Sequence, residues 1–190
     1  MRGTQYDAVV VGSGPNGLAA AITLAREGRS VLVIEGAATP GGGMRSAALT
    51  LPGFVHDVCS AIHPLAAASP FFRTLPLEKF GVEWIHPPLP LAHPLDGGRA
   101  ALVERSVEAT AARLGEDGDA YRTVFEPLVR DCGKLLRDFL GPLRLPHHPL
   151  AMARFGVQAL MPASVYARAR FRTGEARALF GGAAAHSIMA

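Results

Sequence analysis

One short glycine pattern constrains the fold of this 190-residue chain more than any other feature. Gly12, Gly14 and Gly17 come directly after residues 6–11, an apolar run that is rich in β-branched residues. Such a run predicts a buried strand of a parallel sheet. Apolar residues at helical spacing follow it, with Gly28 as the expected C-terminal cap. The pattern therefore lies where a strand turns into a helix.

A second apolar run, residues 30–35, predicts another buried strand that ends at Glu35. Two parallel strands joined by a helix of about a dozen residues form one right-handed βαβ unit. In such a unit Gly12 allows the tight turn, Gly14 lets a pyrophosphate approach the backbone, and Gly17 lets the helix pack on the strand. The free N–H groups of the helix N-terminus then face the phosphates.

The position of Glu35 supports a nucleotide site. It lies 18 residues beyond Gly17, where a carboxylate accepts hydrogen bonds from the ribose hydroxyls of an adenine dinucleotide. A 2′-phosphate would meet like charge there, so NADP is disfavoured. FAD and NAD sites share this fingerprint, and the alternative without a ligand is a tight strand-to-helix turn.

The segment after the second strand favours FAD. Glu35, then the Gly41-Gly42 pair, then Arg45-Ser46 resembles the extended dinucleotide motif of FAD-containing amine oxidases, protoporphyrinogen oxidases and phytoene desaturases. A second glycine pair lets another loop lie close to the cofactor, and Arg45 places a cation near the diphosphate. This sequence departs from the motif at Gly43, where many members carry arginine. The alternative for this loop is a flexible surface turn.

The resemblance extends along most of the chain. Residues 51–60, then His63-Pro64 and residues 69–71, resemble the phytoene dehydrogenase-like branch of bacterial flavoproteins, and the match continues more loosely through residues 117–121. It implies FAD and the oxidation or desaturation of an apolar small molecule through the flavin. Members of that family run to several hundred residues. The resemblance therefore predicts an N-terminal portion of the fold, whose partner is the missing C-terminal portion.

The two lines of reasoning give one predicted cofactor site. Its residues are Gly12, Ser13, Gly14, Pro15, Asn16, Gly17, Glu35, Gly41, Gly42, Gly43, Arg45 and Ser46. No catalytic side chain is assigned, because the flavin carries the redox chemistry. The resemblance places four further polar residues near the flavin, and we interpret them as packed loop residues that make a poor metal site. They are His56, Asp57, Cys59 and His63.

The rest of the chain predicts a different architecture. Residues 49–58 predict a strand pair turned at Pro52-Gly53, and residues 82–85, 89–93 and 99–103 predict a small antiparallel sheet. Apolar residues at steps of four and three between 121 and 139 predict an amphipathic core helix, with Cys132 as a buried thiol. Residues 150–190 predict two or three helices. The His147-His148 pair is expected in a rigid loop.

We therefore predict an α/β fold that is incomplete. A Rossmann-like βαβ unit belongs to the first part of the FAD-binding domain, residues 1–72, and is followed by a small antiparallel sheet and a mostly helical part of a substrate domain, residues 73–190. Met152, Phe155, Leu160 and Met161 lie near Arg154, Arg168, Arg170 and Arg172. These residues predict either substrate-domain core with a solvated arginine face, which we favour, or a basic helix in peripheral contact with a membrane.

Composition excludes several other classes of protein. The 19 basic residues are interleaved with 16 acidic ones, so no long basic block indicates a nucleic-acid partner. Two cysteines, Cys59 and Cys132, are too few for a secreted disulfide scaffold, and they favour a reducing, cytoplasmic location. The uncharged run of residues 8–25 contains the glycine pattern, which no single membrane helix accommodates.

Two alternatives to the flavoprotein stay open. An NAD-dependent dehydrogenase is expected to have more βαβ units after residue 60 than the pattern predicts. A truncated chain without activity of its own acts at most as a binding or assembly partner.

Overall fold

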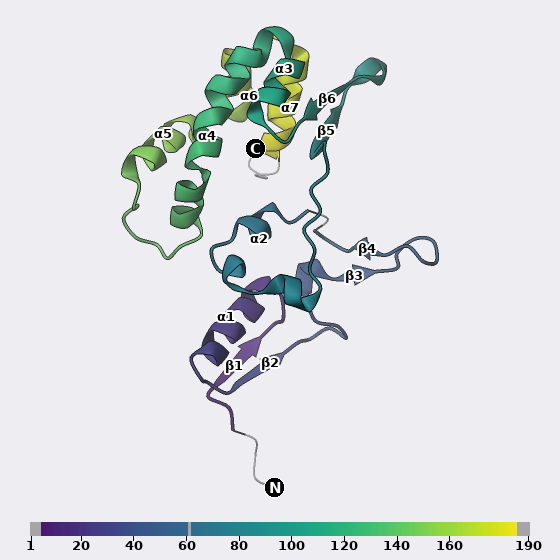
Figure 1. The fold of residues 1–190 in the computed structure, drawn as a ribbon, viewed down its shortest axis with the longest axis vertical. Helices are drawn as coiled ribbons and strands as arrows, with labels where there is room; N and C mark the ends of the chain where they lie inside the picture. The colour runs from purple at the N-terminus through teal and green to yellow at the C-terminus, as the bar shows by residue number, and fades with distance from the viewer. Residues whose placement is uncertain (1–4, 61, 186–190) are drawn as a thin grey trace. The chain divides into compact units, whose positions relative to one another are not determined.

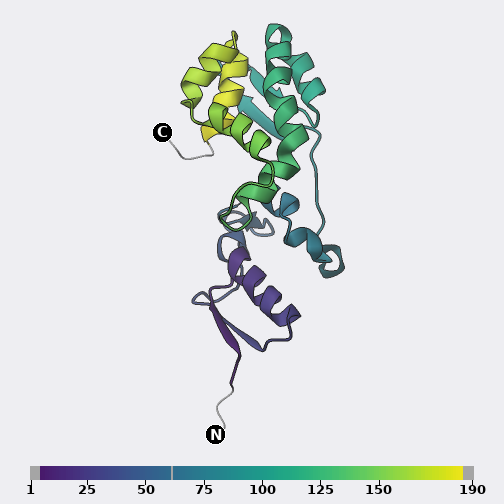
Figure 2. The ribbon, with the colours of Figure 1, turned by 90° about the vertical axis from the view of Figure 1, so that its left-hand side faces the viewer.

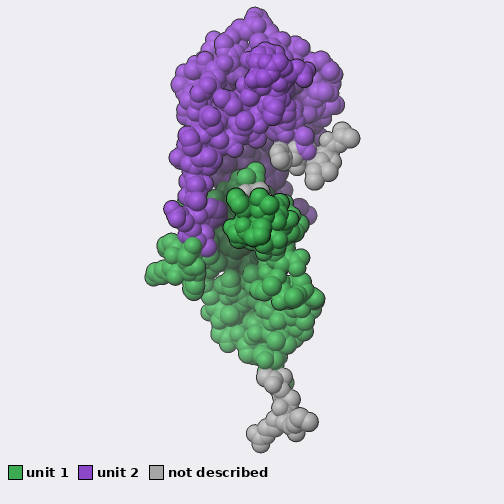
Figure 3. Space-filling model, turned by 90° about the vertical axis from the view of Figure 1, so that its right-hand side faces the viewer, with its two compact units in different colours: residues 1–81 green, residues 82–190 purple. Residues whose placement is uncertain are grey.

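The computed structural model describes residues 5–60 and 62–185, which fall into two compact units (Figures 1 and 3). Unit 1 comprises residues 1–81 and unit 2 comprises residues 82–190. The division lies nine residues after the boundary that the sequence predicts. The assignment of the two parts to a cofactor domain and a substrate domain stays a prediction.

Unit 1 starts with the predicted βαβ unit. Strands β1 and β2 pair in parallel, with Ala8 opposite Val31 and Val11 opposite Ile34, and helix α1 connects them. Figure 2 shows α1 lying along the strand pair. The helical and strand elements of unit 1, in order, are β1 Ala8–Val11, α1 Pro15–Arg26, β2 Val31–Ile34, η1 Gly42–Met44, β3 Ser46–Ala47, β4 His56–Asp57, α2 Pro64–Ala68, η2 Phe72–Thr74 and η3 Leu77–Phe80.

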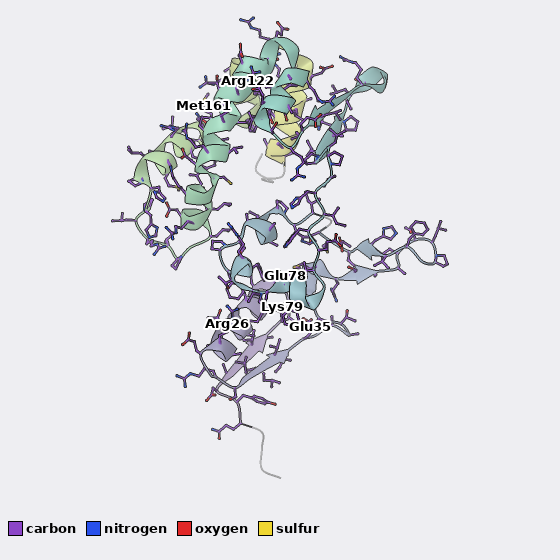
Figure 4. All side chains as sticks on the ribbon, viewed as in Figure 1. Arg26, Glu35, Glu78, Lys79, Arg122 and Met161 are labelled. Carbon is purple, nitrogen blue, oxygen red and sulfur yellow. The ribbon has the colours of Figure 1, made fainter. Side chains whose placement is uncertain are left out.

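The ends of α1 follow the sequence rules. Gly14 is its N-cap residue and Pro15 occupies the first turn, where the missing N–H of proline costs no hydrogen bond. Gly28 comes directly after the C-cap Glu27 and has the left-handed φ of +76°. At the same end, the guanidinium of Arg26 donates to the hydroxyl and the carbonyl of Thr74, which ties α1 to η2 (Figure 4).

The prediction that both strands are buried is wrong. Val9, Val11 and Ile34 are 55%, 82% and 47% exposed. Alternate side chains of a strand point to opposite faces, and α1 packs on one face of this two-stranded sheet. In the part of unit 1 that the structure describes, no other layer buries the opposite face.

The predicted strand pair within residues 49–58 is shorter and lies further out. Ser46 pairs with Asp57 and Ala47 with His56, while residues 49–55 form the connecting loop with a turn at Leu51. Residues 82–85, for which the sequence predicts a strand, have no regular structure. Pro87 and Pro88 follow directly, and proline supplies no N–H to a strand ladder.

Unit 2 contains the predicted antiparallel pair and a set of helices. Strands β5 and β6 pair from Leu91 opposite Val103 to Pro94 opposite Ala100, around a turn at Gly97 and Gly98. The helical and strand elements of unit 2 are β5 Leu91–Pro94, η4 Asp96–Gly98, β6 Ala100–Val103, α3 Val107–Arg113, η5 Gly115–Asp117, α4 Gly118–Phe139, α5 Pro149–Ala159, α6 Ala163–Arg170 and α7 Gly174–Ala185.

The core of unit 2 lies where α3, α4, α6 and α7 meet β6. Phe171 is 1% exposed and its ring centroid lies 5.9 Å from that of Phe180, which stacks on Tyr166 at 5.3 Å. Tyr121 and Phe125 of α4 stack at 4.3 Å. These aromatic side chains supply most of the apolar area that holds the helices together.

The buried carboxylate of Asp117 joins two parts of this core. It accepts hydrogen bonds from the backbone amide of Arg172 at 2.9 Å, and from the amide and hydroxyl of Thr173 at 2.7 and 2.6 Å. Burial raises the pKa of Asp117, but the three hydrogen bonds lower that pKa by more, so it lies below its ordinary value.

Helix α4 is amphipathic as predicted, but the prediction that Cys132 is buried is wrong. Cys132 is exposed, whereas its neighbour Asp131 is 7% exposed. The carboxylate of Asp131 is paired with Lys134 at 2.8 Å and with Arg154 of α5 at 3.6 Å. These cations compensate the buried charge, so the face of α4 toward α5 is centred on Asp131 rather than on the thiol.

The histidine pair and the arginine-rich segment take defined places. Asp138 accepts hydrogen bonds from the backbone amides of His147 and His148, at 3.1 and 3.3 Å, and thereby fixes the loop before α5. Met152 and Phe155 lie on α5, whereas Arg168 and Arg170 lie on α6. The two sets therefore do not share one helix, because Pro162 separates α5 from α6.

None of the helices within residues 5–60 and 62–185 combines the length and the apolar character needed to cross a membrane.

We predict that Asp117→Asn destabilises the helices of unit 2 by about 1–3 kcal/mol at neutral pH, because an amide nitrogen would face the donors that the carboxylate now accepts from. Since the folded-state pKa of Asp117 is lowered, its contribution is complete above the ordinary aspartate pKa and is lost as the pH falls through the lowered value. The difference between wild type and variant should therefore shrink in acid. Urea denaturation followed by far-ultraviolet circular dichroism measures it.

Asp96→Asn is the matched control, because it makes the same change of charge at an exposed side chain. Its unfolding midpoint should equal that of the wild type. Equal losses in both variants would show that net charge, rather than the hydrogen bonds of Asp117, is responsible.

Candidate functional site

The predicted phosphate turn leads from β1 into α1. The backbone amide of Gly12 donates to the carbonyl of Ile34 at 2.7 Å, which ties the turn to the end of β2. Gly12 has a φ of +95°, which side-chain-bearing residues rarely adopt. No side chain caps α1, no acidic residue lies in its first turn, and Pro15 lacks an N–H. The amides of Asn16 and Gly17 are thus the first-turn donors available to a ligand.

Close packing requires glycine at position 17. A Cβ atom there would lie 2.1 Å from the carbonyl oxygen of Gly12 and 3.6 Å from a methyl carbon of Val10. The first of these distances is far below van der Waals contact. Helix α1 therefore approaches the turn as closely as it does because position 17 has no side chain.

The second glycine loop crosses the first backbone to backbone. A Cβ atom on Gly42 would lie 2.9 Å from the Cα atom of Gly14, and Gly42 itself has a φ of +58°. The amide of Gly41 donates to the carbonyl of Ser13 at 3.1 Å. The structure thus brings residues 12–17 and residues 41–43, which are separate in the sequence, into direct contact.

Arg45 supplies a cation at the second loop. Its Nε atom donates to the carbonyl of Gly42 at 2.9 Å, and its side chain is half-buried against Gly41. Within the described ranges it has no carboxylate partner. Its charge is therefore available to an anion, as expected of a diphosphate-binding residue.

Ser46 and Gly43 take places that the prediction did not specify. The hydroxyl of Ser46 donates to Asp57 at 3.0 Å, across the β3–β4 pair. Gly43 is exposed, and its carbonyl accepts a hydrogen bond from Ser60 at 3.3 Å. The direct role of both residues in cofactor binding stays a prediction.

Glu35 lies at the end of β2 and is bonded to the phosphate turn (Figure 4). Its Oε2 atom accepts from the amide and the hydroxyl of Ser13, at 2.8 and 2.5 Å, and its Oε1 atom accepts from the amide of Ala37 at 2.9 Å. The Ser13 hydroxyl, followed by the Ala37 and Ser13 amides, lowers the pKa of Glu35 to about 2. Glu35 therefore presents an ionised carboxylate at every pH at which such a chain is normally studied.

The structural role of Ser13 is the feature that sequence reasoning missed. Ser13 belongs to the predicted site only as part of the turn, and its side chain is 2% exposed. The signal was the presence of a hydroxyl residue between two motif glycines, in a loop that otherwise consists of small or apolar residues. Periodicity says nothing about such a residue, because its partner is 22 positions away.

The four polar residues near the expected flavin position do not form one cluster. The Nε2 atom of His56 lies 2.7 Å from the hydroxyl of Thr50, Asp57 bonds Ser46, and His63 is the N-cap residue of α2. Cys59 is exposed, with its Cβ atom 3.8 Å from a Cβ placed on Gly43. Among the described residues there is also no group of three His, Cys, Asp or Glu side chains arranged to hold a metal ion.

Comparisons with known proteins agree with this geometry. Residues 10–75 match a protein-family model described as an NAD(P)-binding Rossmann-like domain. Over 125 residues the chain is 29% identical to a limonene dehydrogenase from Castellaniella defragrans, covering 64% of this chain and 22% of that protein. It is 46% identical over 61 residues to the chloroplastic prolycopene isomerase of Daucus carota, covering 32% of this chain and 10% of that protein.

A solved structure shares the fold. The chain superimposes on a redesigned putrescine oxidase with a TM-score of 0.50 and 23% sequence identity, over 91% of this chain and 35% of that one. The chain therefore spans between a tenth and about a third of the lengths of these relatives. Together the matches confirm the Rossmann-like dinucleotide-binding fold and the resemblance to carotenoid desaturases and amine oxidases.

We predict that Gly17→Ala loosens the βαβ unit, because the new methyl group must displace the carbonyl of Gly12. Overpacking of this kind costs about 1–3 kcal/mol. Hydrogen exchange of the β1 and β2 amides, read by mass spectrometry on the full chain, should show correspondingly faster opening. Gly36→Ala is the matched control, because a Cβ atom on Gly36 meets no atom within 4 Å. Wild-type protection in Gly17→Ala would contradict the assigned packing role.

Proposed function

We propose that this chain holds the adenine-dinucleotide half of FAD, as the first part of the cofactor domain of an FAD-dependent oxidoreductase. The observation that carries the proposal is the backbone crossing of Gly14 and Gly42. It places a second glycine loop, with a free arginine, against the phosphate turn. A turn that binds only through its first glycine motif has no need of this second loop.

The residues of the two loops fit such a cofactor. The open amides at the start of α1 and the guanidinium of Arg45 would hold the diphosphate, and the carboxylate of Glu35 would accept from a ribose hydroxyl. The side-chain-free surface of the glycine loops lets the diphosphate approach the backbone. When bound, FAD supplies a hydride acceptor for the oxidation of a substrate carbon–hydrogen bond.

We further propose an apolar or unsaturated substrate and a cytoplasmic location. The relatives in which this chain finds partial matches are named for limonene and prolycopene, both hydrocarbons. The two cysteines are free thiols in separate units, which fits a reducing compartment. The oxidation itself is proposed for the whole protein, since the chain spans only part of the length of its relatives.

An NAD-dependent dehydrogenase is the second candidate, because the matching family model is described as NAD(P)-binding. The described residues contain one parallel strand pair, whereas a dehydrogenase of this class is built from two βαβαβ halves. The same binding experiment therefore includes NAD⁺ as a competing ligand.

We predict that the full chain binds FAD, seen as flavin fluorescence quenching and a visible absorption spectrum of bound flavin, and that Gly14→Val abolishes binding by blocking the phosphate turn. Arg45→Gln should weaken FAD binding about tenfold and reduce its salt dependence, because one charge-assisted contact is lost. Tighter binding of NAD⁺ than of FAD would favour the dehydrogenase.

Arg29→Gln provides the control for charge. Arg29 is exposed just beyond the C-terminal end of α1, remote from the phosphate turn, so its variant should bind FAD like the wild type. A wild-type chain that binds neither FAD nor ADP would overturn the proposed function.

A further inference from the structure

Ser13 is a buried hydroxyl residue bonded to two further segments of the predicted site. Its amide and hydroxyl both donate to Oε2 of Glu35. Its carbonyl and hydroxyl oxygens both accept from the amide of Gly41, at 3.1 and 3.3 Å. One residue of the phosphate turn therefore joins the end of β2 and the start of the second glycine loop.

These bonds leave one part of the Glu35 carboxylate free. An ionised carboxylate has about four lone-pair positions, two on each oxygen. Ser13 takes both positions of Oε2, and the amide of Ala37 takes one position of Oε1. The remaining acceptor position is on Oε1, and a hydroxyl donor of the ligand is directed to it.

Building on the proposed cofactor function, we infer that Ser13 is a positioning residue: its hydroxyl fixes Oε2 of Glu35 and thereby presents Oε1 to a ribose hydroxyl of the adenine nucleotide. The same hydroxyl anchors the second glycine loop through Gly41. Ser13 thus sets the ribose contact and supports the loop that faces the diphosphate.

Hydrogen bonds, rather than neighbouring charges, keep Glu35 ionised. Of the groups that lower the pKa of Glu35, the Ser13 hydroxyl contributes most, and the others are backbone amides of residues 13, 36 and 37. No described charged side chain contributes, and the guanidinium of Arg45 is bonded to Gly42. Removal of the Ser13 hydroxyl should therefore raise the pKa of Glu35 toward its ordinary value and make nucleotide binding sensitive to acid.

The chain contains a matched control at the other end of the same strands. The amide and hydroxyl of Ser30 both donate to Oδ2 of Asp7, at 2.8 and 2.7 Å, just before β2 and β1 begin. The donors and the kind of acceptor are the same as in the pair of Ser13 and Glu35. Ligands of open α/β sheets bind at the carboxyl ends of the strands, and the Ser30 pair lies at the amino ends. Ser30→Ala thus removes an equivalent bond outside the site.

The experiment measures the binding of ADP and of 2′,3′-dideoxy-ADP to the full chain by calorimetry between pH 7.5 and pH 4.5. For the wild type we expect ADP to bind more tightly than the dideoxy compound, with little change in that preference over the pH range. Ser13→Ala should weaken ADP binding about tenfold at pH 7.5, reduce the preference for ADP, and weaken binding further as the pH falls. Ser30→Ala should match the wild type in all three readouts.

The possible outcomes separate this inference from the proposed function. A folded Ser13→Ala chain with the wild-type preference for ADP and the wild-type pH profile overturns the inference and leaves the proposed function intact. Equal losses in Ser13→Ala and Ser30→Ala also overturn it, because the hydroxyl would then serve stability alone. If Ser13→Ala does not fold, Ser13→Cys, which keeps the shape with a weaker donor, is judged by the same criteria. A wild type that binds neither ADP nor FAD overturns the proposed function, and the inference with it.

Discussion

The close approach of two backbone segments, at Gly14 and Gly42, is the constraint on which the rest of the candidate site depends. Any side chain at position 42 would meet the Cα atom of Gly14, so the two loops contact each other only as bare backbone. This contact directs the amide of Gly41 at Ser13 and brings Arg45 to the same place. A pocket built from backbone amides and one cation is well suited to an anionic ligand.

Local rules predicted the part of the fold that local physics decides. The strand, turn and helix around Gly12 to Gly17 follow from periodicity and from the steric freedom of glycine, and so does the β5–β6 pair around Gly97. The burial of Cys132 was mispredicted because apolar periodicity ranks side chains by type, whereas the face of α4 toward α5 is decided by the cations around Asp131. The bond of Ser13 to Glu35 was equally invisible, since it joins residues far apart in the sequence.

The exposure of β1 has the same origin. The sequence of β1 is apolar on both faces, as in strands covered by a layer on each side. Within the described residues α1 covers one face, which leaves Val9 and Val11 in contact with water. Periodicity correctly identified a strand suited to two-sided burial, but it does not identify what covers the second face. The candidate site is less affected, because it is made of loops that follow the carboxyl ends of β1 and β2 and are held by their own hydrogen bonds.

Those hydrogen bonds also show how the same local device serves two purposes. A serine amide and hydroxyl hold one carboxylate oxygen at each end of the strand pair, through Ser30 and Asp7 before the strands and through Ser13 and Glu35 after them. At the first end the bond joins two exposed strand starts, and nothing else converges there among the described residues. At the second end the bond lies beside an uncapped helix N-terminus and a free guanidinium. A carboxylate next to open anion-binding groups is useful only if its orientation is fixed, because a mobile one would fold back onto those donors itself. The clamp by Ser13 prevents this competition, and it thereby keeps the positive groups free for phosphate while Glu35 faces the ribose.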